Sequence, residues 1–527
     1  MLTAEEYRES LRRYRPRVFV DGEAVGSVAD EPRLAPGIAA IGVTYDFATR
    51  PEYAEVMTAK QATSGRTVNR LVHLNDHNQD LLQKLEAVRL VCRESGCAQR
   101  YLTHDGLNAL SAATQVADAE HAGTAASRHE RFLDYLHRVQ DEDLTLGIAM
   151  TDAKGDRSKH PGAQANPDVY VHVTERRPDG IVIRGTKAIV TGAPYVHEFL
   201  VMPCRTMTAD DADFAVCCAV PVDAPGVTIV ARPAGRPGER QAAFSGRYGQ
   251  STGVVLFDDV FVPHDRVFLA GEYAEAGLLT TTYATHHRHS CIGARAGFGD
   301  LLIGAGALMV EANGLDPDRH GHIRDAMVEL ITVVESFFAC GVAASVYGIT
   351  VTPGLGGAGG VMPDPVFANI GKLLLATKIY DMHRLAHYVS GGLIVALPGP
   401  DEDHNPETAA SLAAVLGGRA DIPAAARLEV ARLVEDLTAS YQGGWYSVMS
   451  LHGGGSPEAM KREIWRNYPV GDKVDLVERL LDRGVAGEAT GLPSIRRRVS
   501  RQPGRCCDAG CDAPPTPSSP HRPNLGP

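Results

Sequence analysis

The feature that most constrains the fold is a change of hydrophobic period in the middle of the chain. From about residue 145 to 267, short β-branched runs such as Ile181–Arg184 alternate with turn residues, which is typical of strands. On both sides the apolar residues recur every three or four positions, as in residues 107–119 and 322–347, which is the period of a helix. The chain is therefore predicted to fold as helices, then a β-rich region, then helices again.

The length of 527 residues exceeds what one compact core usually holds, so several domains are expected. We predict an α+β protein with an N-terminal helical domain at 1–143, a middle domain at 144–272 and a C-terminal helical domain at 273–484. The many short strands predict a small antiparallel β-barrel or sandwich in the middle, and the long periodic segments after it predict a helical bundle. Residues 485–527 are rich in proline and arginine and are predicted to be a disordered tail.

Composition argues against two classes of partner. The formal net charge of -12 disfavours a nucleic-acid-binding protein, which usually has a basic face. The N-terminus lacks the basic and apolar regions of a signal peptide, and no run of about 18 uninterrupted apolar residues occurs. We therefore expect a cytoplasmic protein without a membrane partner.

Cysteines before the tail are scattered without paired CxxC motifs, so reduced thiols are expected and no metal site is predicted.

The stretch from Gly147 to Arg157 begins the β-rich region. Its apolar run ends at Met150 and Thr151, and a polar turn containing Asp156 follows. This order suits a strand edge that presents N–H groups and a hydroxyl to a flat polar ligand, and it equally suits a strand ending in a surface turn. Thr191, which precedes Gly192, has the same two interpretations: turn chemistry, or a hydroxyl facing the same site as Thr151.

Three further segments contain groups capable of chemistry. The segment 97–105 combines a thiol, Arg100, Tyr101, an imidazole and a carboxylate, and is either a substrate-binding helix end or a solvated one. In 286–291, His287 and Cys291 share a helix face, and an imidazole suits general acid–base work, although plain helix packing is the alternative and is preferred for the other two histidines. Segment 452–456 has three glycines that permit close backbone approach to a ligand before a helix start.

Together these motifs resemble the 4-hydroxyphenylacetate 3-monooxygenase family of flavoproteins, and within it the branch that includes 4-hydroxybutyryl-CoA dehydratase. The resemblance covers most of residues 1 to about 485. The motifs that support it are Met150–Arg157, Gly185–Ala193, His197-Glu198, Phe257–Pro263, His287-Arg288, Pro363–Asn369 and His452–Pro457.

The resemblance implies an acyl-CoA-dehydrogenase-like fold with a middle β-barrel and a C-terminal four-helix bundle, usually assembled as a homotetramer. It also implies FAD between the barrel and the bundle. The residues expected to bind the cofactor are Met150, Thr151, Asp156, Thr191, His452, Gly453, Gly454, Gly455 and Ser456.

Departures from the family pattern bear on the reaction. The dehydratase holds a [4Fe–4S] cluster through three cysteines and one histidine. Here Cys97 and His287 match two of those positions, while Tyr101 and Ala294 occupy the others, so we expect neither a cluster nor another metal. The hydroxylases instead use an arginine and a tyrosine four residues apart to bind a phenol. Tyr101 falls on that tyrosine, Cys97 replaces the arginine, and Arg100 is a neighbouring substitute.

We therefore predict a two-component monooxygenase that uses FADH2 from a separate NAD(P)H flavin reductase, together with O2, to hydroxylate a phenolic or other aromatic substrate. Tyr101, Arg100 and His287 are the catalytic candidates, with Arg288 as electrostatic support. The alternative is a cluster-free dehydratase or isomerase acting on an acyl-CoA or carrier-bound acid. A flavin-binding scaffold without activity is a third possibility.

Overall fold

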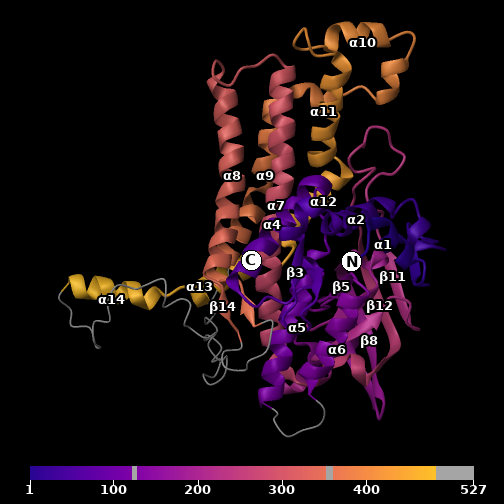
Figure 1. Cartoon of the computed structure of the whole chain (residues 1–527), viewed down its shortest axis with the longest axis vertical. Helices are drawn as coiled ribbons and strands as arrows, with labels where there is room; N and C mark the ends of the chain where they lie inside the picture. The colour runs from indigo at the N-terminus through magenta and orange to yellow at the C-terminus, as the bar shows by residue number, and fades with distance from the viewer. Residues whose placement is uncertain (121–126, 352–359, 482–527) are drawn as a thin grey trace, which may run out of the picture.

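The computed structural model describes residues 1–120, 127–351 and 360–481. The predicted disordered tail at 485–527 lies outside these residues. Figure 1 shows two β-sheets and their covering helices on one side of the molecule and a group of long helices on the other. This mixture of helices and sheets confirms the predicted α+β class.

The N-terminal region is built mainly from helices. They are α1 (Ala4–Leu11), α2 (Ala35–Thr49), α3 (Ala54–Met57), α4 (Asn78–Ser95), α5 (Tyr101–Glu120) and α6 (Arg128–Asp141). The first helix begins where its sequence predicts a capping box. The backbone N–H of Glu6 donates to Oγ1 of Thr3 (3.2 Å), and the Thr3 N–H donates to the Glu6 carboxylate (2.8 Å).

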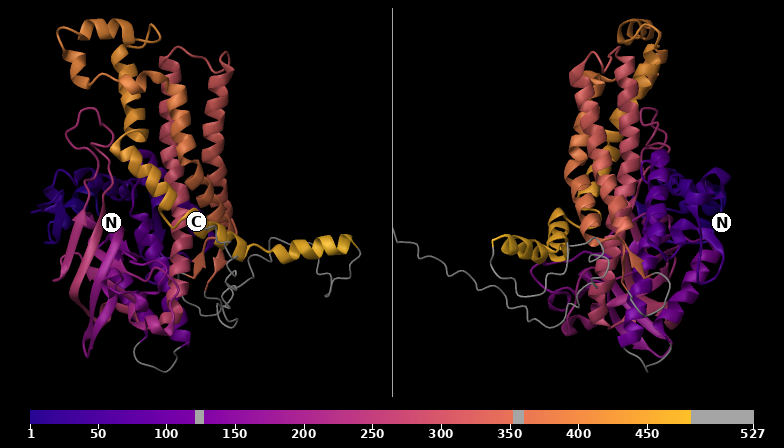
Figure 2. Two further views of the ribbon diagram at one scale, coloured as in Figure 1. Left: turned by 180° about the vertical axis from the view of Figure 1, so that it is seen from behind. Right: turned by 60° about the vertical axis from the view of Figure 1, so that its left-hand side comes forward.

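The middle of the chain contributes nine strands to two sheets. They are β5 (Leu146–Ala149), β6 (Thr151–Asp152), β7 (His172–Arg177), β8 (Gly180–Thr191), β9 (Glu198–Val201), β10 (Val216–Pro221), β11 (Val227–Ala231), β12 (Thr252–Pro263) and β13 (Val267–Ala270). One sheet also includes two N-terminal strands, β1 (Arg17–Val20) and β2 (Glu23–Ala24), and has the order β2-β1-β11-β12-β8-β6, with β7 also paired to β8. The other sheet has the order β13-β10-β9-β5. Figure 2 shows the strands of the larger sheet side by side.

These sheets differ from the predicted antiparallel barrel. In the described part of the chain neither sheet closes on itself, and the pairs β1–β11 and β5–β9 are parallel. Two of the strands come from the N-terminal region, β1 (Arg17–Val20) and β2 (Glu23–Ala24), and a separate hairpin joins β3 (Thr58–Lys60) to β4 (Thr67–Asn69). The reason is pairing at long range: Arg17 pairs with Thr228, and no local pattern in a four-residue strand encodes so distant a partner.

The C-terminal part contains the long helices α7 (Tyr273–Ala312), α8 (Gly321–Val346) and α9 (Pro365–Ser390), which pack against one another. The short pair β14 (Ile349–Thr350) and β15 (Val361–Met362) lies between α8 and α9. The remaining helices are α10 (Ala409–Leu416), α11 (Ala424–Thr438), α12 (Tyr441–His452), α13 (Pro457–Asn467) and α14 (Val470–Leu480). Of these, α13 packs against α9, and Figure 2 shows the last helix, α14, extending away from the long helices.

Two helices, α7 and α8, are long and apolar enough to cross a membrane by length and composition alone. The apolar window of α7 is 67% buried inside the molecule, whereas that of α8 is 33% buried. Burial of α7 is explained by its position, because it packs against α4 and α5 on one side and α8 and α9 on another. The polar residues in the first half of α7 are thereby brought against the start of α5.

Candidate active site

Tyr101 and His287, which come from separate motifs, lie side by side. Tyr101 is the first residue of α5, and His287 is in the first half of α7. Their ring centroids are 6.2 Å apart with planes inclined by 23°, and the imidazole also stacks on Tyr283 at 5.6 Å and 11°. Aromatic faces carry partial negative charge, so this surrounding favours a protonated imidazole.

Asp105 provides His287 with a negative neighbour. Its Oδ2 lies 3.7 Å from Nδ1 of His287, while its Oδ1 accepts a hydrogen bond from Oγ of Ser290 (2.8 Å) and lies 3.4 Å from Nζ of Lys84. Burial alone would lower the pKa of His287, but Cys291 and Asp105 together outweigh burial and raise that pKa to about 9. His287 is therefore a cation at neutral pH.

Cys97 contacts the hydroxyl of Tyr101. The two atoms, Sγ and the phenol oxygen, are 3.7 Å apart, and both residues are buried. A hydrogen bond from the Cys92 thiol, supported by the charge of Arg295, lowers the pKa of Cys97 against the opposing effect of burial. Burial, with the neighbouring Cys97 next, holds the pKa of Tyr101 well above its usual value, so the phenol stays protonated and can donate a hydrogen bond.

Two buried cations, neither of them predicted from the sequence, complete this group. Arg295 lies on α7 and donates through Nε to Oγ of Ser450, and Lys372 lies on α9 and donates to the Ser450 carbonyl (2.6 Å). Burial lowers the pKa of Lys372 to about 8. Neither position belongs to a sequence motif. The feature of the sequence that could have identified them is a charged residue on the otherwise apolar face of a core helix.

Arg288 connects α7 to its neighbours. Its Nε donates to the carbonyl of Gly454 (2.8 Å), and its Nη1 donates to Oδ1 of Asn369 on α9 (2.8 Å). Gly454 has a φ of +75°, and a Cβ at this position would lie 3.2 Å from side-chain carbons of both His287 and Arg288. The glycine loop after α12 therefore lies directly against the predicted catalytic residues.

The rest of this loop is arranged as a helix start. His452 is the last residue of α12, and the Gly455 N–H donates to its carbonyl (3.0 Å). Gly453 has ordinary backbone angles, whereas Gly455 has a φ of +102°. Ser456 is the N-cap of α13, because its hydroxyl accepts from the Ala459 N–H (3.4 Å).

The predicted strand edge at Met150 and Thr151 lies on the sheet side of the same region. Thr151 pairs with Ile189, and Nζ of Lys187 holds the edge by donating to the Met150 carbonyl (3.0 Å) and pairing with Asp152 (2.7 Å). The strand β5, which leads into Met150, is joined to α5 by a hydrogen bond from the Leu146 N–H to the hydroxyl of Thr103 (2.9 Å). The edge is thus tied to the helix that begins with Tyr101.

Thr191 ends β8 opposite Thr252, whose hydroxyl accepts from the indole N–H of Trp445 on α12 (3.3 Å). The next residue, Gly192, faces Gln99, since a Cβ at Gly192 would lie 3.4 Å from Oε1 of Gln99. The Gln99 amide is buried, and neither of its polar atoms has a hydrogen-bond partner within the described residues. A buried amide in this state is a suitable contact for a polar ligand between the sheet and α5.

Asp156 and Arg100 do not contact the group around Tyr101 and His287. Asp156 is exposed and accepts from the N–H (3.0 Å) and hydroxyl (2.7 Å) of Ser158, which closes a local turn. The Arg100 guanidinium forms a buried ion pair with Asp143 and stacks on the ring of Tyr45 at 3.7 Å. The structure therefore does not bring Arg100 together with its neighbour Tyr101, because successive residues at a helix start project in different directions.

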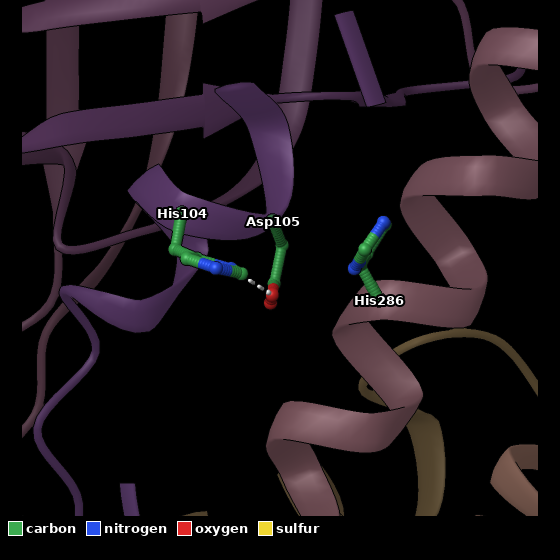
Figure 3. A group of neighbouring side chains, drawn as sticks. All are labelled: His104, Asp105 and His286. Carbon is green, nitrogen blue, oxygen red and sulfur yellow. Dashed lines mark hydrogen bonds and ion pairs between the residues drawn. The ribbon is translucent and has the colours of Figure 1, made fainter. Parts of the chain in front are cut away.

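A second buried group, shown in Figure 3, consists of His104, Asp105 and His286. Potential ligand atoms of the three residues lie within 4.8 Å of one another. His104 and Asp105 come from α5, and His286 comes from α7 (Figure 3). The ammonium group of Lys84 lies 3.4 Å from Oδ1 of Asp105, and Oδ2 faces His287, so the group is an internal ion pair beside two packed imidazoles.

Cys97 and His287, which match two of the predicted cluster-ligand positions, lie on either side of Tyr101. The Tyr101 hydroxyl contacts the Cys97 sulfur, and the Tyr101 ring stacks on His287, so a phenol occupies the position between the two potential ligands. Ala294 is buried and offers no ligand atom. Of the four positions that match cluster ligands, Cys97 and His287 offer ligand atoms, and the thiols of Cys92 and Cys291, at other places in the chain, lie beside them.

Known proteins match the chain over nearly its whole length. The family model described as 4-hydroxyphenylacetate 3-hydroxylase N terminal matches residues 3–269, and the corresponding C-terminal model matches residues 276–482. The chain is 34% identical to the 4-hydroxybutyryl-CoA dehydratase/vinylacetyl-CoA-Delta-isomerase of Clostridium aminobutyricum, over 91% of this chain and 99% of that protein. It is 26% identical to the oxygenase component of 4-hydroxyphenylacetate 3-monooxygenase from Thermus thermophilus, over 88% and 94% of the two proteins.

Solved structures agree with these matches. An oxygen-tolerant archaeal 4-hydroxybutyryl-CoA dehydratase from N. maritimus superimposes with a TM-score of 0.87 at 32% identity, covering 95% of this chain and 99% of that one. The oxygenase component of 4-hydroxyphenylacetate 3-monooxygenase complexed with FAD superimposes with a TM-score of 0.78 at 23% identity, covering 91% and 98%. The second likeness, at this identity, concerns the fold alone.

The mixed helices and sheets define an α+β protein, and the family that it matches is one of enzymes. The two family models cover more than half of the chain, so the family is settled. The chain belongs to the 4-hydroxyphenylacetate 3-hydroxylase family.

Proposed function

We propose that this protein is the oxygenase component of a two-component, flavin-dependent monooxygenase that hydroxylates a phenolic or other aromatic substrate. Among the family's activities, the observation that favours this one is the Tyr101–His287 pair, in which a protonated phenol and an imidazolium lie 6.2 Å apart between ring centroids. Several relatives are named as oxygenase components of phenol monooxygenases, which supports the same choice.

The cofactor we propose is FAD, received as FADH2 from a separate NAD(P)H flavin reductase. When bound, reduced FAD supplies the electrons that activate O2. The residues of this chain then have the task of binding the substrate, orienting it and excluding water.

His287 and Tyr101 would bind the substrate hydroxyl. An imidazolium and a neutral phenol both donate hydrogen bonds, and a cationic donor favours the ionised form of a bound phenol. An ionised phenol has a more electron-rich ring, which is the form that an electrophilic oxygen attacks. The nearby charges of Arg295 and Lys372 act in the same direction.

Features on two sides of this pair suit the flavin. Met150 and Thr151 at the sheet edge, Thr191 at the end of β8 and the unpartnered amide of Gln99 offer polar contacts to a flat heterocycle. On the other side, His452, Gly453, Gly454, Gly455 and Ser456 leave room for close approach and end at a helix N-terminus, which suits an anionic group. Arg288 supports the site through its hydrogen bond to the Gly454 carbonyl, whereas Asp156 and Arg100 are bound to Ser158 and Asp143 and have no part in this proposal.

Replacing Gly454 by alanine is expected to weaken FAD binding about fivefold to tenfold. A left-handed φ of +75° costs an alanine roughly 1–2 kcal/mol, and the new Cβ would press on His287 and Arg288 at 3.2 Å. Titration of the apoprotein with FAD by fluorescence measures the dissociation constant. Gly444→Ala is the matched control, because Gly444 is within helix α12 and has open space at its Cβ. Equal affinities for the two variants would exclude a role of this loop in holding the cofactor.

A coupled assay tests the proposed reaction. The protein, a generic flavin reductase, NADH, FAD and a panel of phenols are incubated in air, and hydroxylated products are identified by mass spectrometry with labelled O2. We expect NADH-dependent incorporation of one oxygen atom into an aromatic product. Tyr101→Phe should reduce product formation about tenfold or more, since it removes a hydrogen bond to a charged group worth roughly 1.5–3 kcal/mol. The proposal would be contradicted if, with every phenol tested, the O2 consumed appeared only as hydrogen peroxide.

A second candidate function is favoured by one specific observation. The 34% identity to a dehydratase and isomerase of acyl-CoA substrates extends over 91% of the chain. We therefore keep a cluster-free dehydratase or isomerase of an acyl-CoA or carrier-bound acid as the alternative. Conversion of an unsaturated acyl thioester without reductase or O2, in the absence of phenol hydroxylation, would favour it.

We further propose that the protein is a cytoplasmic homotetramer with the acyl-CoA-dehydrogenase-like arrangement of three domains and a C-terminal four-helix bundle. Apolar side chains on the outside of the long helices support self-association. Val328 and Ile331 on α8 and Tyr388 on α9 are 53%, 41% and 53% exposed in the single chain. Such residues are commonly covered by another subunit.

A further inference from the structure

A carboxylate, an imidazole and a thiol lie in sequence where α5 meets α7. Oδ2 of Asp105 is 3.7 Å from Nδ1 of His287, and Nε2 of the same imidazole is 3.7 Å from Sγ of Cys291. The two nitrogens of one ring thus face an acid on one side and a thiol on the other. This is the order of groups that activates a cysteine in nucleophilic catalysis.

The imidazole and the carboxylate are held in place by their surroundings. Stacking on Tyr283 at 5.6 Å and on Tyr101 at 6.2 Å fixes the plane of His287. Ser290 binds Oδ1 of Asp105, so the other carboxylate oxygen, which has no hydrogen-bond partner within the described residues, is left facing the imidazole. The orientation of the ring therefore does not depend on a bound ligand.

The charges around Cys291 favour an anion. Cations from three helices face it: Lys84 on α4, Lys372 on α9, and His287, Arg288 and Arg295 on α7. The phenols of Tyr101 and Tyr283 also face the thiol. Burial holds the pKa of both phenols well above the usual value, with a further contribution from the neighbouring thiols at Tyr101 and from Asp105 at Tyr283. Burial alone would raise the pKa of Cys291, but His287, with Lys372 and Arg295, outweighs it and lowers that pKa.

We propose that Cys291 is a nucleophilic thiolate, held by His287 and Asp105, and that it takes α,β-unsaturated carbonyl compounds. Cys291 is partly exposed, whereas Cys97, the other thiol beside Tyr101, is 1% exposed. Of these two thiols, Cys291 is therefore the one that a dissolved compound can reach. This inference is independent of the proposed hydroxylation, because it concerns a thiol that needs neither flavin nor O2.

The proposed reaction is a conjugate addition of the thiolate to the C=C bond. The Cys291 sulfur donates an electron pair to the β carbon and forms a C–S bond. The π electrons of the C=C bond move to the α carbon, which takes the proton from Nε2 of His287. In the reverse step neutral His287 removes the α proton and the C–S bond breaks, which restores the thiolate and the imidazolium.

Acrylamide, a small unsaturated amide, is the probe. The full-length protein is treated with it between about pH 5.5 and 9.5, and the adduct on the Cys291 peptide is quantified by mass spectrometry. An ordinary thiol, with a pKa of about 8.5, is only about 1% ionised at about pH 6.5, although its thiolate is the more reactive one. We therefore expect His287→Gln to lower the rate at Cys291 about fivefold to tenfold at about pH 6.5. At about pH 9.5 the variant should react as fast as the wild type or faster.

Tyr283→Phe is the matched control, since it keeps the stacked ring and should keep the wild-type pH profile. The crossing of the two profiles separates a charge effect from altered access, because a change of access would lower the rate by the same factor at every pH. A uniform factor would overturn the proposal. So would a native Cys291 that stays unmodified at every pH while the unfolded protein reacts.

Discussion

Replacing His287 by glutamine is expected to lower the rate of substrate hydroxylation about 100-fold or more, the usual contribution of a positioned general acid or base. The side chain lies between Asp105, Cys291 and Tyr101, and these neighbours stabilise its protonated, positively charged form. Turnover in the coupled assay measures the effect. His404→Gln, at an exposed position, is the control and should keep wild-type turnover.

The pH dependence of the same reaction follows from the direction of the shift. The pKa of His287 is raised to about 9, so the imidazolium is present below that pH and is lost as the pH rises through it. If the imidazolium binds the substrate hydroxyl, kcat/KM of the wild type should fall as the pH rises through about 9, and His287→Gln should lack this fall. A profile that is unchanged by the substitution would show that another group causes the alkaline limb.

Replacing Lys187 by methionine is expected to lower the free energy of unfolding by about 3–5 kcal/mol, because it leaves a buried carboxylate without its cation. Lys187 and Asp152 are both 2% exposed in their side chains and lie 2.7 Å apart. The same ammonium group also donates to the carbonyls of Met150 and Met202 (3.0 and 2.9 Å). Its loss therefore weakens the attachment of the edge strand β6 to β8 and also leaves the buried carboxylate of Asp152 unpaired.

Chemical denaturation of the single variant, of Asp152→Asn and of the double variant measures this effect as a double-mutant cycle. The double variant should recover part of the loss, because it buries no unpaired charge. Arg462→Ala breaks the exposed pair with Glu458 and should change the unfolding midpoint little. Equal stability of Lys187→Met and the wild type would mean that water reaches Asp152.

The predicted site was only partly recoverable from the sequence. Tyr101 and His287 were chosen as catalytic candidates, and the structure brings their rings together. Arg100 was chosen for its position beside Tyr101, yet its guanidinium is bound to Asp143 on the far side of the helix start. Asp105, by contrast, is one of several polar residues in its segment of the sequence, and in the structure it acts with Cys291 to raise the pKa of His287.

Local features of the fold were predictable because their physical causes lie within a few residues. The 3.6-residue period, the capping box of Thr3 and Glu6, and the helix start at Ser456 and Pro457 all depend on neighbours in the chain. The α+β class and the family motifs followed in the same way from the sequence. These features determine which elements form.

Tertiary packing decided how the elements combine and which side chains meet. The parallel pairing of Arg17 with Thr228 adds an N-terminal strand to an open sheet, where an antiparallel barrel or sandwich was predicted. Contact of α5 with α7 brought the acid of one helix to the imidazole and thiol of the other. Such contacts join residues more than 180 positions apart in the chain. Their energies come from burial and pairing that exist only once whole elements are packed, so no local pattern in the sequence encodes them.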